Sequence, residues 1–168
     1  MIPTFVSAAE TAELIRLASG RAVLELGTQY GYSCLRMAET ARVVVTVDWH
    51  LGDPDAGEVD SLPAFAHNYR QRQGLGSLVP VVGRTEQVLP MLRPFSFDML
   101  FHDAGHDFAS VDRDLTLALP LLKLGAWVAV HDWGLFEVAK AATPILGPPA
   151  RLVGRLAIWR LWPGRSDT

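Results

Sequence analysis

The feature that most constrains the fold is a series of short, continuous apolar runs separated by segments with helical periodicity. The clearest run is 42–48, in which four valines and one threonine lie between Arg42 and Asp48. A strand that is apolar at successive positions is typical of a parallel sheet covered on both faces, whereas a half-exposed antiparallel strand alternates. We expect similar strands over residues 22–26, 78–82, 97–103 and 126–131.

Helical patterns occupy the intervals between these runs. Ser7 and Glu10 have the spacing of a capping box that begins the first helix. Ser61 is predicted to cap a later helix, and Pro120 to bend or restart another. The remaining helices are expected over 31–40, after Thr85, and from 134 to 146. Residues 50–60 predict a surface loop and 151–162 one or two closing, antiparallel strands. This alternation predicts one α/β domain over residues 1–168, with a doubly wound, mostly parallel sheet and helices on both faces.

Composition excludes several classes of protein. Apolar residues make up 49% and charged residues 20% of the chain, as in globular proteins. With 15 basic against 18 acidic residues and no basic run, nothing supports a nucleic-acid partner. No stretch approaches the roughly 20 apolar residues of a membrane helix. A single cysteine and an N-terminus without signal-peptide features predict a cytoplasmic protein.

In a doubly wound sheet the ligand lies beyond the carboxyl ends of the strands, so functional residues are expected directly after the strands. The first strand is followed by a turn with the spacing Gly-x-x-x-Gly, from Gly27 to Gly31. Gly27 permits a tight turn, and Gly31 would let a ligand approach the start of the next helix. Gln29 stands where a dinucleotide motif has its central glycine, which disfavours NAD. Taken alone, the turn is equally consistent with a structural role.

The next two strand ends carry candidate nucleoside contacts. Asp48 ends the second strand, 23 residues after Glu25, and a carboxylate there can accept both hydroxyls of a ribose; a helix cap is the alternative. Trp49 is placed to cover an adenine face or to pack at the rim. Residues 83–86 are placed to edge an adenine or to cap the helix that follows.

The last two parallel strands end in acids and histidines. Asp103 and His106 follow one strand, and the pair His131-Asp132 follows the other. His106 is a candidate general base because its ordinary pKa is near neutrality. Asp103 and Asp132 are candidate ligands of Mg²⁺, which prefers carboxylates. The alternatives are helix caps and structural hydrogen bonds. We expect His102 to be structural, and His50 and His67 to be solvated.

Six segments together resemble a known family. They are ELGTQYGYS, VDW, LPAFxxN, VVGRTEQVL, FDxLFHDAGHDFASVxxDL and LLKLGAWVAVHDW, and they occur in the order found in class I S-adenosylmethionine-dependent methyltransferases, in particular the methyltransferase-24 group. The resemblance implies a seven-stranded sheet with an antiparallel strand near one edge. Together with the strand-end positions described above, it predicts a cofactor site made by Glu25, Gly27, Thr28, Gln29, Tyr30, Gly31, Ser33, Asp48, Trp49, Gly83, Arg84, Thr85, Glu86 and Asp103.

Within that site the resemblance assigns roles. The turn from Gly27 to Ser33 would hold the methionine part, supported by Glu25. Asp48 would bind the ribose, Thr85 and Glu86 would line the adenine, and Asp103 would lie near the sulfonium and the reacting methyl group.

The chain departs from the family pattern at three places. Arg84 stands where an aspartate is common, and Ala104-Gly105 replaces a glycine and an acid. His131-Asp132 replaces the two acids of related metal-dependent sugar methyltransferases, which leaves a Mg²⁺ site short of ligands.

We therefore expect a methyltransferase that acts on a small-molecule acceptor, at a hydroxyl oxygen, with His106 and Asp103 as catalytic residues. The alternatives are a non-catalytic cofactor-binding or assembly subunit and an NAD-dependent oxidoreductase. The absence of a Tyr-x-x-x-Lys pair disfavours the oxidoreductase. The acceptor pocket would come from residues 50–60, from the strand ends, or from a second subunit of a homodimer.

Overall fold

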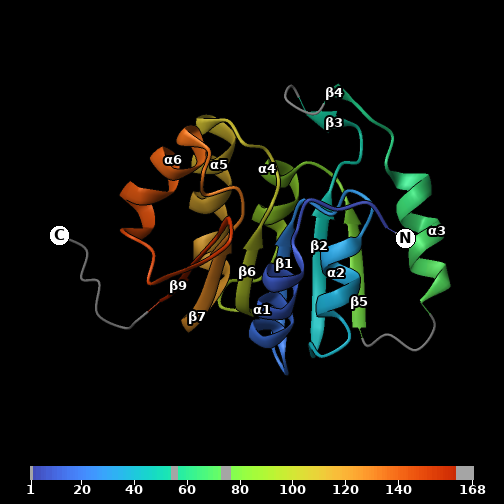
Figure 1. Ribbon diagram of the computed structural model, residues 1–168, viewed down its shortest axis with the longest axis horizontal. Coiled ribbons are helices and arrows are strands. Elements are labelled where there is room, and N and C mark those ends of the chain that lie inside the picture. Colours follow the sequence, from blue (N-terminus) through green and yellow to red (C-terminus); the bar gives the residue numbers. More distant parts are fainter. Residues whose placement is uncertain (1, 54–56, 73–76, 162–168) are drawn as a thin grey trace.

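The computed structural model describes residues 2–53, 57–72 and 77–161 of the 168-residue chain. Its main sheet has seven strands in the order β5-β2-β1-β6-β7-β9-β8 (Figure 1). The strands are β1 (Ala22–Leu26), β2 (Val43–Asp48), β5 (Ser77–Val82), β6 (Phe97–His102), β7 (Leu122–Val130), β8 (Arg151–Val153) and β9 (Leu156–Arg160). The first five pair in parallel, and β9 runs antiparallel to both β7 and β8. The predicted sheet, with an antiparallel strand next to one edge, is confirmed.

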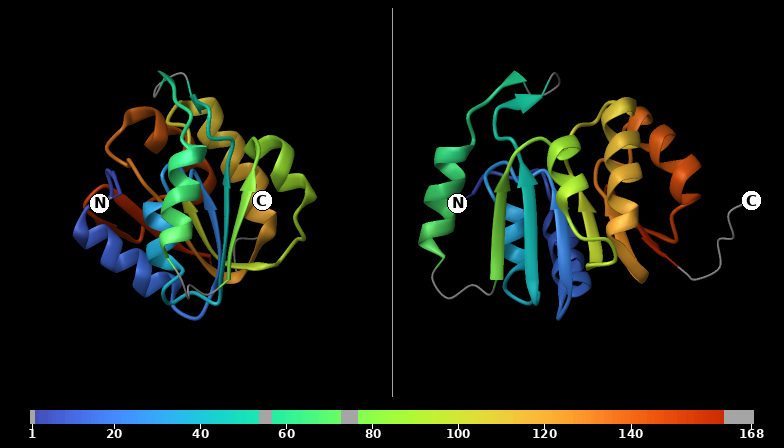
Figure 2. Two further views of the ribbon diagram at one scale, coloured as in Figure 1. Left: turned by 90° about the vertical axis from the view of Figure 1, so that its right-hand side faces the viewer. Right: turned by 180° about the vertical axis from the view of Figure 1, so that it is seen from behind.

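The helices form a layer on each face of the sheet (Figure 2). The helices α1 (Ala8–Ala18), α2 (Tyr32–Met37) and α3 (Leu62–Gln71) contribute to one apolar core. The other core contains residues of α4 (Thr85–Val88), α5 (Phe108–Ala118) and α6 (Phe136–Leu146). Strand β1 supplies both cores, because side chains of successive residues point to opposite faces. Leu24 and Leu26 belong to the second core, and Val23 to the first.

The predicted helix starts are confirmed at Ser7 and wrong in detail at Ser61. Glu10 accepts a hydrogen bond from the Ser7 N–H at 2.7 Å, and the Ser7 hydroxyl accepts one from the Glu10 N–H at 3.3 Å, which completes the capping box. Helix α3 does begin at Leu62, but Ser61 makes no side-chain cap. Its hydroxyl lies 2.8 Å from Nδ1 of His50 instead.

The expectation that His50 is solvated is wrong. It has a φ of 63° and is only 3% exposed, and its ring stacks on Phe65 of α3 with the centroids 5.4 Å apart. The His50 ring, in the turn after β2, covers the apolar face of α3 at Phe65 and is buried by this contact. His67 is exposed and His102 is buried, as predicted.

Local features of the loops also differ from a simple strand–helix alternation. Residues 50–60 contain a short hairpin of β3 (Gly52–Asp53) and β4 (Gly57–Glu58), where we predicted only a loop. Pro120 lies in a 3-10 turn, η2 (Leu119–Leu121), directly after α5, because proline cannot continue the hydrogen-bond ladder of the helix. A second 3-10 turn, η1 (Leu89–Met91), follows α4. Among the described residues, none of the helices is long and apolar enough to cross a membrane.

Candidate functional site

A cavity of about 1390 Å³ opens at the carboxyl ends of the parallel strands. It exceeds the range of about 300–1,000 Å³ that is usual for small-molecule sites, so a cofactor and an acceptor can share it. Most of the site residues predicted from the sequence line it: Gly27, Thr28, Gln29, Tyr30, Ser33, Asp48, Trp49, Gly83, Arg84, Thr85, Glu86, Asp103, His106 and Asp132. Residues 3–6 of the N-terminal segment line it as well, which the sequence did not suggest.

Gly27 is required where β1 passes β6. Its φ is +91°, and an added Cβ would lie 2.0 Å from the carbonyl oxygen of Asp103. The Asp103 N–H donates to the carbonyl of Leu26 at 2.9 Å, so the two strand ends are joined at this point. Only glycine permits this approach, which brings Asp103 to the cavity.

Gly31 makes room for the packing of α3. It also has a positive φ, +87°, but an added Cβ would lie 2.7 Å from the ring of Phe65. Phe65 is buried and belongs to α3. Among the described residues Gly31 does not line the cavity; the missing side chain makes room for α3.

Glu25 supports the turn from beneath, as the resemblance implied. It is completely buried and accepts a hydrogen bond from the Ser33 hydroxyl at 2.6 Å. Thr46 donates to the other carboxyl oxygen and contacts the hydroxyl of Thr28. Burial raises the pKa of Glu25 to about 7, and the two hydroxyl donors only partly offset it. A carboxyl group that does not line the cavity thus holds both ends of the turn.

Asp48 fixes the same turn from the neighbouring strand. One carboxylate oxygen accepts the N–H groups of Thr28 at 2.8 Å and Gln29 at 2.7 Å. The other accepts the N–H of His50 at 2.7 Å. Because an ionised carboxylate offers about four acceptor positions, Asp48 retains capacity for a further donor from the cavity.

Trp49 and Arg84 face each other across the ends of β2 and β5. The Arg84 guanidinium lies 3.6 Å from the centroid of the Trp49 ring, within the range of a cation–π contact. The Trp49 Nε1 donates to the carbonyl of Gly52 at 2.5 Å, which fixes the ring. Arg84 occupies the N-cap position of α4 but makes no side-chain cap. The two residues form a flat cationic and aromatic edge on the cavity.

Thr85 is directed toward α5. Its hydroxyl donates to Asp114 at 2.5 Å, and the other Asp114 oxygen lies 3.3 Å from Nε2 of His102. His102 and Asp114 are both buried. The predicted structural role of His102 is therefore explained by this contact.

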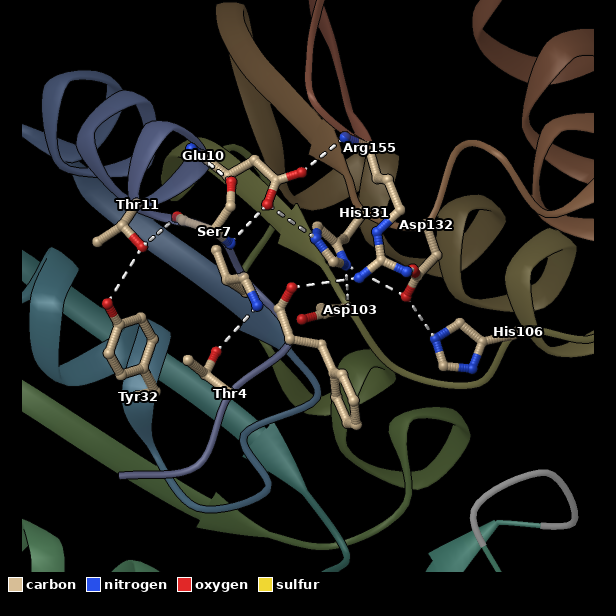
Figure 3. A network of polar contacts seen from close by, with 12 residues as sticks. Thr4, Ser7, Glu10, Thr11, Tyr32, Asp103, His106, His131, Asp132 and Arg155 are labelled. Atoms are coloured by element: carbon tan, nitrogen blue, oxygen red, sulfur yellow. Dashed lines mark hydrogen bonds and ion pairs between the residues drawn. The ribbon is translucent and has the colours of Figure 1, made fainter. Parts of the chain in front are cut away.

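The ends of β6 and β7 bring four titratable side chains together (Figure 3). Nδ1 of His131 lies 3.2 Å from a carboxylate oxygen of Asp103 and 3.2 Å from one of Asp132. Nε2 of His106 lies 2.9 Å from the same Asp132 oxygen. Asp132 has a φ of 55°, a conformation that aspartate tolerates better than most residues. The predicted convergence of Asp103, His106 and Asp132 is present in the structure.

Charge in this cluster is strongly perturbed. Burial alone would lower the pKa of His131, but the carboxylates of Asp103 and Asp132 outweigh it and raise this pKa to about 10. Burial opposes ionisation of Asp132, yet hydrogen bonds from His106 and His131 hold its pKa well below the ordinary value. Perturbed groups at a cavity are a mark of functional sites.

Two members of the cluster, Glu10 and Arg155, were not predicted from the sequence, and neither was a site role for His131. Glu10 lies 3.5 Å from Nε2 of His131, on the side opposite Asp103 and Asp132. Arg155 lies in the turn between β8 and β9. Its Nη1 is 2.8 Å from Oδ1 of Asp132, the carboxylate oxygen that the two histidines do not contact. Glu10 already has a local role in the capping box, so its pattern does not indicate a second one. Nothing in the sequence around Arg155 indicates a contact with Asp132, 23 positions earlier.

The same cluster contains three side chains with metal-ligating atoms. Asp103, His131 and Asp132 each offer one ligand atom, and these atoms lie within 4.8 Å of one another. Mg²⁺ requires oxygen ligands and retains several waters. Here a nitrogen lies between the two carboxylates, and both oxygens of Asp132 already contact Arg155, His106 or His131. The donor set does not fit Mg²⁺.

Comparison with known proteins identifies the family. The family model described as a methyltransferase domain matches residues 24–133, well over half of the chain. The chain belongs to this methyltransferase family. The matched range begins in β1 and ends just beyond Asp132, so it contains the ends of all five parallel strands. No curated protein matches the chain.

Solved structures agree with this assignment. Cofactor-bound Rv0187 from MTB is 25% identical, with a TM-score of 0.73, and the match covers 95% of this chain and 83% of that one. The O-methyltransferase TomG from Streptomyces achromogenes, in complex with SAM, is also 25% identical, with a TM-score of 0.71 and coverages of 95% and 82%. The O-methyltransferase NovP, at 17% identity, shares the fold with a TM-score of 0.78 and coverages of 95% and 82%.

The methyltransferase uses S-adenosylmethionine, as the resemblance implied. The alternative of an NAD-dependent oxidoreductase is therefore set aside, and so is that of a subunit without enzymatic activity. The cofactor fits the cavity in kind: a glycine turn, a strand-end carboxylate and an aromatic edge line it in the order of the chain.

Proposed function

We propose that this methyltransferase transfers the methyl group of S-adenosylmethionine to a hydroxyl oxygen of a small-molecule acceptor, with His106 as the general base. The observation that carries the proposal is the contact between His106 and Asp132, 2.9 Å apart at the edge of the cavity that also contains Asp103. A histidine oriented by a carboxylate is a recurrent arrangement for removing a proton from a hydroxyl group.

The cofactor would lie along the strand ends. The turn from Gly27 to Ser33 would hold the methionine part, and Asp48 would use its remaining acceptor capacity for the ribose. Trp49 and Arg84 would border the adenine, with Gly83, Thr85 and Glu86 beside them. The sulfonium supplies an already activated methyl group, so the protein mainly has to align donor and acceptor.

At the reacting end each residue has a defined task. Asp103 lies between Gly27 and His131 and would place a negative charge beside the sulfonium. His106 would accept the proton of the acceptor hydroxyl at Nδ1, because its Nε2 faces Asp132. Asp132 would orient the imidazole and stabilise the cation that forms, as the carboxylate of a catalytic triad does. The donor set argues against the other option, a Mg²⁺ ion held by Asp103 and Asp132.

The acceptor would enter between the N-terminal segment and the hairpin of β3 and β4. Phe5 is 81% exposed and Leu51 is 51% exposed, and both line the cavity. Apolar side chains at a cavity mouth favour an acceptor with an aromatic or aliphatic body. The similarity to TomG, an O-methyltransferase involved in tomaymycin synthesis, supports a hydroxyl oxygen of a small molecule as the acceptor.

The experiment is methyl transfer from radiolabelled S-adenosylmethionine to a panel of phenols, catechols and sugars. His106→Gln should lower turnover by about 10²- to 10⁴-fold, while calorimetry finds unchanged affinity for S-adenosylhomocysteine. His67→Gln, which changes an exposed histidine of α3, is the matched control and should retain full activity. Full turnover in His106→Gln would overturn the assignment of the base.

A further inference from the structure

Arg155 connects its own turn with the N-terminal segment, with α1 and with the residues after β7, at the catalytic end of the cavity (Figure 3). Its Nη1 lies 2.8 Å from Asp132, and its Nη2 donates to the carbonyl of Phe5 at 3.2 Å. Its backbone N–H donates to Glu10 at 2.6 Å, and its carbonyl accepts the N–H of Trp133 at 3.0 Å. The side chain is half exposed, yet the guanidinium, the backbone N–H and the backbone carbonyl of Arg155 all have partners.

The turn that carries Arg155 is built for this position. Gly154 has a φ of +58°, and an added Cβ would lie 2.5 Å from the carboxylate of Glu10. Glycine thus lets the β8–β9 turn approach the start of α1 closely enough for the Arg155 N–H to reach Glu10. The glycine at position 154 thus places the Arg155 guanidinium next to Asp132, which follows β7.

Three carboxylates around one histidine ring need a further cation nearby. Glu10, Asp103 and Asp132 surround the buried ring of His131, and carboxylates removed from water require a cation nearby. In a metal-dependent enzyme a divalent ion meets that need. Here a guanidinium, which stays charged at all ordinary pH values, covers the outer oxygen of Asp132.

We propose that Arg155 takes the place of a divalent metal ion, so that the catalytic centre is complete without one. Arg155 is then a positioning residue: it holds Asp132, and Asp132 holds His106. This inference rests on the proposed roles of Asp132 and His106. A carboxylate in place of His131 would be the fourth in the cluster and would require an additional cation.

Metal binding tests the first half of the proposal. Thermal unfolding of the EDTA-treated protein is measured with Mg²⁺, Mn²⁺ and Zn²⁺ at about 5 mM or below, with each bound metal counted by mass spectrometry. The wild-type protein should bind none of them stoichiometrically, and its melting temperature should move by less than about 1 °C. The double variant His131→Asp, Arg155→Met should gain a Mg²⁺-dependent rise of several degrees. Stoichiometric metal in the wild type that is lost in Asp103→Asn would overturn the proposal, even if the double variant fails to fold.

Histidine side-chain NMR tests the second half. The ¹⁵N–¹H signals of His106, assigned with His106→Gln, should move in Arg155→Met and return toward their wild-type positions in Arg155→Lys. Arg151→Met is the matched control, because it removes an arginine of β8 that pairs with Glu13 on α1. It should leave the His106 signals in place. Unmoved signals in a folded Arg155→Met protein would contradict a positioning role.

Binding of S-adenosylhomocysteine separates this inference from the proposed function. If the wild type binds S-adenosylhomocysteine and also binds a divalent metal at the cluster, the methyltransferase site stands and the role of Arg155 falls. If no S-adenosylhomocysteine binds, the cofactor assignment itself fails, whatever the metal result.

Discussion

Nε2 of His106 and Oδ2 of Asp132 lie 2.9 Å apart, although the two residues are 26 positions apart in the chain, with the whole of α5 and β7 between them. Each follows one of two adjacent parallel strands, β6 and β7, so the sheet register brings them together. The N–H of His131 donates to the carbonyl of His102 at 2.9 Å, and this hydrogen bond fixes the ends of β6 and β7 next to each other. The proposed acid–base pair is therefore a product of topology and needs no long loop.

S-adenosylhomocysteine should stabilise the protein, and NAD should not. The turn after β1 has Gln29 at the central glycine position of a dinucleotide motif, with a φ of 44°. A ligand present at about 100 times its dissociation constant raises the free energy of unfolding by roughly 2.7 kcal/mol. Differential scanning fluorimetry checks this, and a shift with NAD but not with S-adenosylhomocysteine would contradict the cofactor site.

Asp48→Ala should weaken cofactor binding and loosen the turn after β1. Loss of one charge-assisted hydrogen bond to the ribose, about 1.5–3 kcal/mol, corresponds to a roughly 10- to 150-fold higher Kd. The N–H groups of Thr28 and Gln29 also lose their acceptor, so the free energy of unfolding should fall as well.

Asp48→Asn separates these two effects, since it keeps an acceptor for the turn but removes the charge. Glu137→Gln, on the exposed surface of α6, controls for the change in net charge. Calorimetry with S-adenosylhomocysteine gives the Kd. An unchanged Kd in a folded Asp48→Ala protein would rule out the ribose contact.

Stability should depend on the ionisation of Glu25. Its pKa in the folded protein is about 7, above its ordinary value of 4.5. Between these values the folded state binds more protons than the unfolded state, so the free energy of unfolding falls as the pH rises from 4.5 to 7. The loss from this group is at most about 3 kcal/mol.

Glu25→Gln removes that loss because the amide stays neutral. Relative to the wild type, the variant should therefore gain about 1–3 kcal/mol between pH 5 and pH 8 in urea denaturation experiments. A difference between the two proteins that is the same at both pH values would show that Glu25 ionises as readily in the folded chain as in the unfolded one.

Gly27→Ala should be among the most destabilising single changes at the site. The added methyl group would lie 2.0 Å from the Asp103 carbonyl, at a φ of +91°. We expect a loss of at least about 2 kcal/mol in the free energy of unfolding, together with lost cofactor binding. Gly134→Ala is the control, because an added Cβ there meets nothing within 4 Å; it should change stability by about 0.5 kcal/mol or less. Equal losses at the two positions would contradict the close approach of β1 and β6.

The layered fold was predictable because each parallel strand can be recognised from its own residues, as a continuous apolar run such as 42–48. The strand-end rule then located Asp48, Asp103 and Asp132 at one cavity. The burial of His50 and the packing role of Gly31 were not predicted, and both have the same cause: Phe65 packs on these residues from α3. Local sequence does not reveal which side chain a distant helix places over a turn.

Arg155 and Glu10 were missed for a related reason. Their contact joins residues 145 positions apart, across the first helix and the last pair of strands. Glu10 had a complete local explanation as part of the capping box, so nothing indicated that its second oxygen serves the site. The strand-end rule applies to parallel strands, so it gives no signal for residues in the turn between antiparallel closing strands.

The most direct test of the account is a crystal structure with S-adenosylhomocysteine bound. We predict that the cofactor lies along the ends of β1, β2 and β5, with its ribose at Asp48 and its sulfur beside Asp103 and facing His106. A sulfur atom more than about 10 Å from Asp103, His106 and Asp132, far beyond the separations at which reacting groups meet, would contradict both the catalytic assignment and the inferred role of Arg155.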